Sequence, residues 1–459
     1  MTTRALILMA KCAFLEIASV PLFKRIIFSG QKAGIDEFFI LYSGKKRSEI
    51  ERSLGMDKRI RSEIKIIDVL NQTEEEVFTD IVSCHNQNYL IIEANTVFDN
   101  RLLQEFSQLS LKNAVAAITI HRSGNIFSKG HNDLNNHDSA DHWYVKLSNN
   151  KLSAISQGLD NYDGRAIGMV LASPGIIKIL IENLLPDTSF SLCKLMKLQI
   201  KDGNILAFDV KDNLCMEVES KQQLHGCEKR LYNSLGSSVD GPIMDKYINR
   251  KISSLITKQL VKTHITPNQT TFLSLVIGII SAWFFWQGGY LNYLAGGLVF
   301  QLSFIFDQCD GEIARLNFME SRVGGLFDAF CDSIIRTFLI LGMTGSLYTE
   351  AKQSLILILG ILSSIGIFIS TMAGSYETFK KEENIGYTDK ESKDTSIEKE
   401  NKLSTFIDKF NNTDSFSIIL FICILSGQLV WFLWTIGIGA FVFTLVILAK
   451  AIIISGKTT

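Results

Sequence analysis

Short apolar runs alternate with amphipathic segments through the first half of the chain. The runs are rich in β-branched and aromatic residues, which favour buried strands, and the segments between them have the apolar spacing of helices. This alternation predicts an α/β domain with a mostly parallel sheet and helices on both faces. The expected strands lie at 5–9, 38–44, 64–70, 89–94 and 114–120, and the expected helices at 21–34, 47–54, 74–84 and 101–111.

From about residue 269 the pattern changes to apolar runs whose lengths approach the ~20 residues that cross a bilayer. We expect an all-α domain of six transmembrane helices. The loop at 375–414 carries seven lysines, whereas the turns on the opposite side carry only Lys352. The positive-inside rule therefore places this loop and both termini in the cytosol. The expected spans are 269–287, 291–308, 326–347, 353–374, 416–433 and 435–454.

Residues 226–268 join the two patterns. Their second part combines apolar positions such as Ile252 and Leu255 with a basic side that includes Lys251 and Lys258. A basic amphipathic helix of this kind lies along a membrane surface, or it packs against the preceding soluble domain. The predicted division is a cytosolic α/β domain at 1–225, a linker with a juxtamembrane helix at 226–268, and a membrane domain at 269–459.

Composition narrows the classes of function. The 459 residues carry a net charge of -1, without the basic excess of a nucleic-acid-binding protein, so no nucleic-acid partner is expected. The eight cysteines are scattered without a CxxC pair, which argues against a zinc site or a disulfide framework. Residues 131–142 contain three histidines, but their spacing matches no tight metal-ligand pattern, and we interpret the segment as a solvated polar loop.

Four aspartates lie in or beside two of the expected spans. An ionisable residue at membrane depth is costly and marks a functional site by default. Asp307 and Asp310 are spaced i, i+3, and Asp328 and Asp332 are spaced i, i+4, so each pair shares one helix face. Because four carboxylates repel each other unless cations hold them together, the pattern favours two Mg²⁺ or Mn²⁺ ions with oxygen ligands. Snorkelling or helix-capping aspartates are the alternative interpretation.

The same aspartates belong to a longer pattern, Asp307-x2-Asp310-Gly311-x2-Ala314-Arg315-x8-Gly324-x3-Asp328-x3-Asp332. It resembles the signature of the CDP-alcohol phosphotransferases, integral membrane enzymes that transfer a substituted phosphate from a CDP-linked donor to an alcohol and release CMP. The resemblance implies a homodimer, and the positive-inside rule places the signature, with Arg315 and Arg322, and hence the active site in the cytosol. The resemblance also implies metal ligation by Asp307, Asp310, Asp328 and Asp332, catalysis by Asp332, and CDP binding by Asp307, Gly311, Ala314, Arg315 and Gly324.

Within residues 1–225, the runs PLFKRIIFSGQKAGIDEFFILYSG, YLIIEANTVFDNRLL and AFDVKDN resemble the sugar-phosphate nucleotidyltransferases. That chemistry needs a Gly-rich loop whose backbone N–H groups cradle a triphosphate, and a pair of metal-binding aspartates. Here no glycine occurs between Ala5 and Phe28, and Asn95 stands where the first aspartate is expected, which leaves Asp209. We predict a nucleotidyltransferase-like domain that is inactive, with residual nucleotide or product binding as the alternative.

Together, the two halves resemble fused enzymes that make CDP-inositol and then di-myo-inositol phosphate phosphate. The predicted function is a membrane CDP-alcohol phosphotransferase for synthesis of a phospholipid or a polyol phosphodiester, with either CDP-diacylglycerol or a CDP-polyol as donor. The alternative is a non-catalytic membrane scaffold or nucleotide-binding protein. Metal-dependent release of CMP distinguishes the two.

Overall fold

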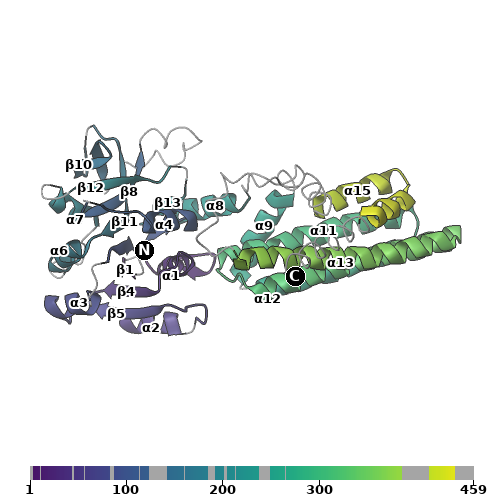
Figure 1. Ribbon diagram of the computed structural model, residues 1–459, viewed down its shortest axis with the longest axis horizontal. Helices are drawn as coiled ribbons and strands as arrows, with labels where there is room; N and C mark the ends of the chain where they lie inside the picture. The colour runs from purple at the N-terminus through teal and green to yellow at the C-terminus, as the bar shows by residue number, and fades with distance from the viewer. Residues whose placement is uncertain are drawn as a thin grey trace, which may run out of the picture. The chain divides into compact units, whose positions relative to one another are not determined.

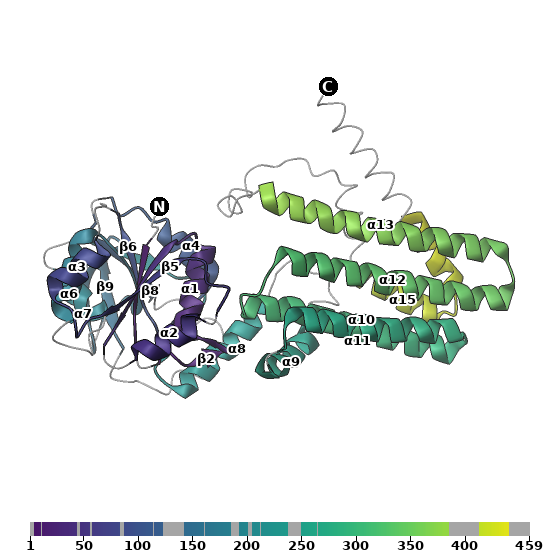
Figure 2. The same ribbon diagram turned by 90° about the horizontal axis from the view of Figure 1, so that it is seen from below.

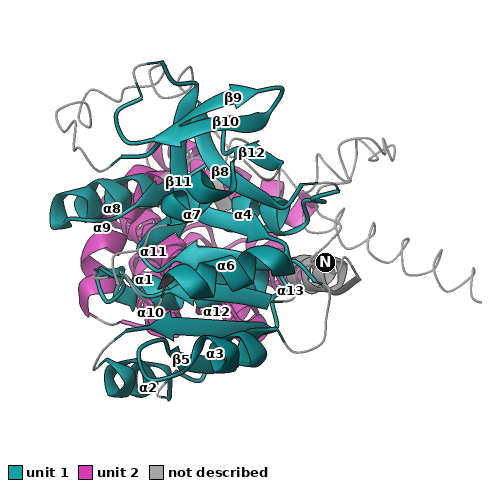
Figure 3. Ribbon diagram, turned by 90° about the vertical axis from the view of Figure 1, so that its left-hand side faces the viewer, with its two compact units in different colours: residues 1–231 teal, residues 232–459 magenta. Residues whose placement is uncertain are grey.

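The computed structural model describes residues 4–439 apart from 11, 44–45, 56, 83–86, 113, 123–141, 160, 185–191, 201–203, 212, 237–248, 264 and 385–412. Most of the histidine-containing segment and of the lysine-rich loop therefore lies outside the described residues. The chain divides into two compact units, residues 1–231 (unit 1) and residues 232–459 (unit 2), which are coloured separately in Figure 3. The predicted boundary after residue 225 falls inside helix α8 (Lys221–Gly236).

Unit 1 is built on a nine-stranded sheet with the order β5-β4-β1-β6-β11-β8-β12-β10-β9 (Figure 1). The neighbours among β5, β4, β1 and β6 pair in parallel, as do β8 and β12. The predicted parallel core is correct, but β11 runs antiparallel between β6 and β8, and β9 and β10 form an antiparallel pair. The strands of this sheet are β1 (Arg4–Leu8), β4 (Glu37–Tyr42), β5 (Glu63–Asp68), β6 (Tyr89–Glu93), β8 (Ala116–Arg122), β9 (Tyr144–Ser148), β10 (Lys151–Ser156), β11 (Gly164–Ala172) and β12 (Ile205–Asp209).

Helices cover both faces of this sheet, as the alternating pattern predicts. Successive side chains of β1 point to opposite faces, so Leu6 packs in one apolar core and Ile7 in the other. Helices α3, α6 and α7 contribute to the core that contains Leu6, and α1, α2 and α4 to the core that contains Ile7. The helices are α1 (Leu22–Lys32), α2 (Arg47–Gly55), α3 (Glu74–Ile81), α4 (Asn100–Ser107), α6 (Pro174–Leu184) and α7 (Leu192–Gln199).

Backbone hydrogen bonds within the chain hold the segment after β1 in a compact turn. It forms a small hairpin of β2 (Glu16–Ile17) and β3 (Val20–Pro21), and α1 follows directly. The first N–H groups of α1 are already used, because Leu22 N donates to Leu15 O at 2.9 Å and Phe23 N donates to Ala13 O at 3.2 Å. A helix N-terminus binds phosphate through N–H groups of this kind. In unit 1 these two groups are therefore engaged by the chain itself.

Two half-buried carboxyl groups lie near each other at the end of β6. Glu93 closes β6 and Glu217 closes the short strand β13 (Cys215–Glu217), which pairs with β7 (Thr96–Phe98). A Cβ on Gly168 would lie 3.1 Å from Glu217 Oε1 and 3.1 Å from Glu93 Cβ. Burial, reinforced by the charge of Glu93, raises the pKa of Glu217 to about 8, although Arg165 Nη2 lies 3.8 Å from Glu217 Oε2.

The stability of unit 1 is expected to fall as pH rises from about 4.5 toward 8, because the folded state holds a proton on Glu217 that the unfolded chain releases. Glu217→Gln removes the contribution of Glu217 to this dependence and should stabilise unit 1 at pH 7 by up to roughly 3 kcal/mol. Hydrogen exchange of the β6 and β13 amides in the full-length protein, at pH 5 and pH 8, measures the effect. Exposed Glu182 on α6 supplies the control, Glu182→Gln. Equal protection of wild type and Glu217→Gln at pH 8 would contradict the prediction.

Unit 2 is helical, and α10, α11, α12 and α13 lie side by side (Figure 2). Helix α10 begins where Pro267 occupies its first turn and the Gln269 side chain accepts the Thr266 N–H at 3.0 Å. Close approach of α10 and α12 requires Gly342, because a Cβ there would lie 2.5 Å from Ala282 O. The elements are α9 (Arg250–Leu260), the 3-10 turn η2 (Val261–Thr263), α10 (Pro267–Gln287), α11 (Tyr290–Leu316), α12 (Arg322–Ala351), α13 (Ser354–Asn384) and α15 (Thr413–Leu425), followed by a helix at Leu429–Gly439.

The predicted count of six spans is not confirmed, and the bounds of the fifth are wrong. Among the described residues, two helical stretches are long and apolar enough to cross a membrane, Pro267–Gln287 and Ser354–Met372. The expected span at 416–433 is broken into two helices by a turn in which Gly427 has φ +68°. A hydropathy window averaged over the run missed this turn, because Ser426, Gly427 and Gln428 interrupt the apolar run only briefly. Most of the expected span at 435–454 lies outside the described residues.

Helix α9 packs on α11 through a polar stripe. Asn249, just before α9, and Ser253 and Thr257 within it are spaced one helical turn apart, and all three are buried. The apolar Leu255 points outward and is 63% exposed. From the sequence, this helix is predicted to pack either on the membrane surface or on the soluble domain. The contact with α11 is a third surface that the amphipathic pattern did not indicate.

Candidate active site

Three aspartates converge between α11 and α12. Carboxylate oxygens of Asp307, Asp310 and Asp328 all lie within 4.8 Å of one another. Asp310 is buried, and the other two are half-buried. The i, i+3 spacing in α11 brings Asp307 and Asp310 to one side of the helix, as the sequence predicts, and the packing of α12 brings Asp328 to them.

A short turn joins the two helices that carry these aspartates. Helix α11 ends at Leu316 with Asn317 as its C-cap, and Phe318 adopts a left-handed φ of 54°. Ser321 then caps α12, where its Oγ accepts the Gly324 N–H at 3.0 Å. Only a few residues separate the end of α11 from the start of α12. The short connection therefore restricts how the two helices, and the aspartates on them, can be oriented relative to each other.

The signature glycines occupy positions where an added Cβ would be in tight contact with a neighbouring side chain. A Cβ on Gly311 would lie 3.3 Å from Arg315 Nη1, so the Arg315 guanidinium lies over this glycine. A Cβ on Gly324 would lie 2.9 Å from Ser321 Oγ and 3.4 Å from Asn268 Oδ1, at the start of α10. The half-buried Ala314 lies in the same last turns of α11. These residues belong to the same turns of α11 and α12 as the aspartates, and Arg315 brings one planar cation close to the Gly311 backbone.

Asp332 stands apart from the three-aspartate group. Its Oδ2 accepts a hydrogen bond from Arg336 Nη2 at 2.8 Å, four residues later on α12. Its charge still acts on Asp307 and Asp310, so it lies within electrostatic reach of the group. The structure therefore brings together three of the four predicted metal ligands and gives the fourth a cationic partner.

Two contributing residues were not in the predicted site. Thr271 of α10 donates an unusually short hydrogen bond from its Oγ1 to Asp310 Oδ2, and Arg336 holds Asp332. The role of Arg336 as a partner of Asp332 could have been predicted from their i, i+4 spacing in the sequence. Thr271 could not be assigned by spacing, because its contact joins residues 39 positions apart.

The donor set fits a hard divalent cation. Asp307 Oδ1 and Asp328 Oδ1 are buried, and neither has a hydrogen-bond partner in the part of the chain that the structure describes. Buried carboxylate oxygens without partners are costly. All-oxygen ligation suits Mg²⁺ or Mn²⁺. The three carboxylates cannot serve as hydrogen-bond partners for one another while all are ionised. A bound cation would supply the missing partner for their oxygens.

The predicted nucleotidyltransferase residues of unit 1 do not converge on a metal site in the part of the chain that the structure describes. The Asn95 side chain is buried at 7% exposure, and its Oδ1 has no hydrogen-bond partner among the described residues. Asp209 Oδ2 lies 3.5 Å from Arg122 Nε. No cluster of three metal-ligating side chains occurs in unit 1 among the described residues.

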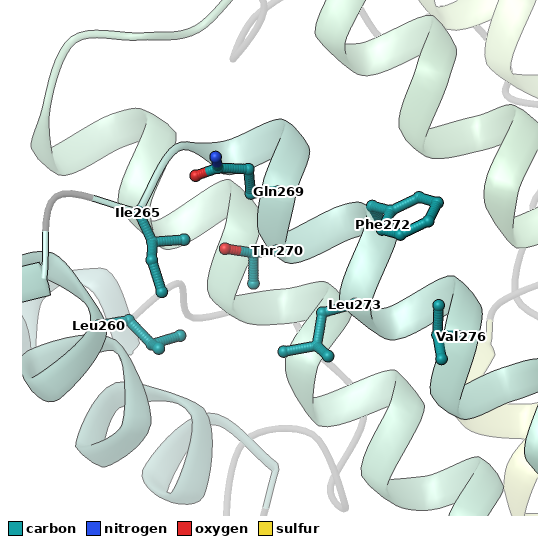
Figure 4. A pocket seen from close by; sticks show the side chains of 7 residues that line it. All are labelled: Leu260, Ile265, Gln269, Thr270, Phe272, Leu273 and Val276. Carbon is teal, nitrogen blue, oxygen red and sulfur yellow. The ribbon is translucent and has the colours of Figure 1, made fainter.

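A groove of about 380 Å³ lies beside α10, lined by apolar side chains except at Gln269 and Thr270 (Figure 4). It offers no carboxylate, imidazole or thiol, so it is not a second metal site. Its wall includes Thr270, whereas the next residue, Thr271, contacts Asp310. The other lining residues are Leu260, Ile265, Phe272, Leu273 and Val276.

Residues 264–407 match the CDP-alcohol phosphatidyltransferase family. This match includes the whole signature and every helix that carries the three-aspartate group. The C-terminal part of the chain is therefore similar to a CDP-alcohol phosphatidyltransferase domain. The resemblance that the signature indicated is confirmed.

The chain is similar to proteins named bifunctional IPC transferase and DIPP synthase. It is 26% identical to the one from Archaeoglobus fulgidus over 291 residues, which cover 63% of this chain and 54% of that protein. It is 29% identical to the one from Rubrobacter xylanophilus over 200 residues, 43% of this chain and 45% of that protein. The chain thus spans about half the length of the curated relatives it matches.

Among solved structures, the inositol-1-phosphate CTP transferase from T. maritima aligns with a TM-score of 0.40 and 15% identity, over 50% of this chain and 96% of that one.

Proposed function

We propose that this protein is an integral membrane CDP-alcohol phosphotransferase that moves a substituted phosphate from a CDP-linked donor to an alcohol and releases CMP. The observation that carries the proposal is the convergence of Asp307, Asp310 and Asp328 within 4.8 Å, inside the family match. A non-catalytic scaffold has no use for buried carboxylates that lack partners. The substrates are a CDP-linked donor and an alcohol acceptor.

Asp307, Asp310 and Asp328 would hold two Mg²⁺ or Mn²⁺ ions, with Asp332 at the edge of the group. Such ions neutralise charge that builds up on transferring phosphate oxygens. The protein's own contribution is to hold the carboxylates in place: Thr271 fixes Asp310 and the helix packing fixes Asp328.

Arg315 is the group proposed to bind the donor diphosphate. A guanidinium is planar and remains charged, and it can form paired hydrogen bonds to phosphate oxygens. Its position over Gly311 supports this role, because no Cβ separates the cation from the backbone there. Gly324 and Ala314 leave similar room for the nucleotide.

Asp332 is the proposed general base. The acceptor hydroxyl oxygen attacks the β-phosphorus, the bond from phosphorus to the CMP oxygen breaks, and the hydroxyl proton passes to an Asp332 carboxylate oxygen. Arg336 orients this carboxylate through its 2.8 Å hydrogen bond, as a third group orients the base in other nucleophilic sites. General-base assistance is typically worth 10²–10⁴ in rate.

A membrane location with six spans and a cytosolic active site and termini is part of the proposal. Two helical stretches have the length and apolarity of spans. Large apolar side chains also cover the outside of α10–α13, which is unfavourable in water and favourable in lipid. Examples are Phe272, Trp283, Leu298, Phe338 and Leu362. We further propose a homodimer, as the family resemblance implies.

Unit 1 is proposed to be inactive in nucleotidyl transfer. The engaged N–H groups of Leu22 and Phe23, the neutral Asn95 and the pairing of Asp209 with Arg122 support this proposal. The CDP-linked donor must then come from another enzyme. CDP-inositol and CDP-diacylglycerol are the donors to compare.

The test uses the full-length protein in lipid nanodiscs with Mg²⁺ or Mn²⁺. We expect CMP release from one of the two donors when a suitable alcohol is present, and none when EDTA removes the metal. The acceptor panel should contain inositol phosphates, glycerol phosphate and free polyols. CDP binding without CMP release from any donor and acceptor pair would favour the scaffold.

A further inference from the structure

Arg336 is a buried cation on α12, one turn beyond the last aspartate of the signature. Its side chain is 7% exposed, and its Nη2 donates to Asp332 Oδ2 at 2.8 Å. A charge buried among apolar helices is costly unless a partner compensates it, and Asp332 is that partner. The proposed function uses this hydrogen bond to orient the base and gives it no effect on the metal.

Asp332 lies between two sources of positive charge. Asp328, Asp332 and Arg336 follow one another at intervals of four residues, so they form one stripe along α12. Helical side chains lean toward the preceding turn, which brings the Arg336 guanidinium to Asp332. On its other side, Asp332 has Asp328 as a neighbour and therefore the cations that the three-aspartate group would hold.

The structure pairs Asp332 with the guanidinium. Carboxylate oxygens of Asp307, Asp310 and Asp328 lie within 4.8 Å of one another, and Asp332 stands apart from them. Its side chain is 21% exposed, so the carboxylate stays accessible. Metal ligation competes with protonation, because a ligand must give up its proton to bind a metal. A carboxylate that accepts the proton of an alcohol is therefore better kept away from the cations.

We infer that Arg336 determines which of two roles Asp332 takes: it holds this carboxylate out of the metal site as the proton acceptor and so restricts metal ligation to Asp307, Asp310 and Asp328. This inference rests on the proposed function for the role of Asp332 as base. It assigns a positioning residue that lies beyond the signature, and it explains why three of the four signature aspartates converge.

The two roles of Asp332 predict opposite changes in two measurements. Arg336→Met removes the guanidinium and leaves a long apolar side chain in the buried position. Released from Arg336, Asp332 should join the bound cations, so we expect Mn²⁺ to bind about 10-fold more tightly. CMP release should slow by about 10²-fold, because the coordinated carboxylate no longer accepts the proton. A purely structural role for Arg336 would not tighten metal binding.

Loss of a positive charge can by itself tighten cation binding, so a second measurement identifies the new ligand. A cation of fixed coordination number releases a water when a carboxylate joins it. Water-proton relaxation of bound Mn²⁺ should therefore show about one fewer bound water in Arg336→Met than in wild type. Arg336→Met combined with Asp332→Asn should keep the wild-type number of waters, because the joining carboxylate is gone.

The experiment uses the full-length protein in nanodiscs and titrates Mn²⁺ by electron paramagnetic resonance, beside the thermal unfolding midpoint. Arg336→Lys keeps the charge but replaces the planar fork with a point charge that holds a carboxylate less firmly. It should change metal affinity, bound water and rate in the same directions by smaller factors, and it decides the inference if Arg336→Met does not fold. Glu350→Gln, at the far end of α12, is the control and should match wild type.

Unchanged or weaker Mn²⁺ binding by the Arg336 variants would overturn the inference, as would tighter binding with an unchanged number of bound waters. A wild-type protein that binds Mn²⁺ but releases no CMP from any donor and acceptor pair would overturn the proposed function alone, since metal affinity and bound water still decide whether Arg336 keeps Asp332 from the metal. A wild-type protein that does not bind Mn²⁺ would overturn both.

Discussion

Asp332→Asn is expected to lower the rate of CMP release by about 10²–10⁴, because the amide cannot accept the proton of the acceptor hydroxyl. Asp332 stands outside the three-aspartate group and is held by Arg336, so the substitution leaves the proposed metal ligands in place. Affinity for CDP should therefore change little. Single-turnover release of CMP, beside CDP titration, measures the two quantities separately.

Glu350→Gln supplies the matched control, because this carboxylate lies on the same helix and hydrogen-bonds Tyr293 away from the aspartates. It should release CMP at the wild-type rate. A near-normal rate for Asp332→Asn would exclude Asp332 as the base. Loss of CDP binding in Asp332→Asn would instead make this residue a fourth metal ligand, as the signature implies.

Asp310→Asn is expected to raise the Mn²⁺ concentration needed for half-maximal CDP binding by more than about 100-fold. Removal of an outer-shell partner alone typically costs 10–100-fold in metal affinity, and loss of a carboxylate ligand removes a charge as well. Asp310 is the buried member of the group and faces two other carboxylates, so no solvent-exposed group replaces it. Metal titration followed by CDP binding measures the shift.

Thr271→Val is the graded counterpart of that variant. It keeps the shape of the side chain and removes the hydroxyl that donates to Asp310, so we expect about a 10-fold shift in the same direction. Asp310→Asn with wild-type metal dependence would show that the three-aspartate group does not hold the cation. An unchanged Thr271→Val would limit the hydroxyl to a packing role.

Local pattern was sufficient for most elements of unit 1. Helix α3 has a capping box, in which Thr73 N donates to Glu76 Oε2 at 2.9 Å, and both ends of the box lie within four residues. The strands β1, β4 and β6 are continuous apolar runs, as parallel strands buried on both faces must be. The antiparallel course of β11 was not predictable, since strand direction depends on a partner far along the chain.

In unit 2 the hydrophobic runs located the helices but not all their ends. The turn at Gly427 divides a run that hydropathy reads as continuous, and a left-handed glycine ends a helix whatever the apolarity of its neighbours. Likewise, amphipathicity identified α9 as a surface helix but not its partner. Small polar residues such as Ser253 pack against a helix only when a matching acceptor faces them, and Glu312 is that acceptor.

The sequence by itself determined the chemistry of the candidate site. The four aspartates, Arg315 and the two glycines lie at helical spacings within a short stretch, and such local relations are read directly from a chain that forms helices. The tertiary structure alone decided which of these groups meet. Asp307, Asp310 and Asp328 converge and Asp332 pairs with Arg336, because the packing of α10, α11 and α12 sets distances that no spacing contains. The same packing brought in Thr271, whose contact with Asp310 joins distant parts of the chain.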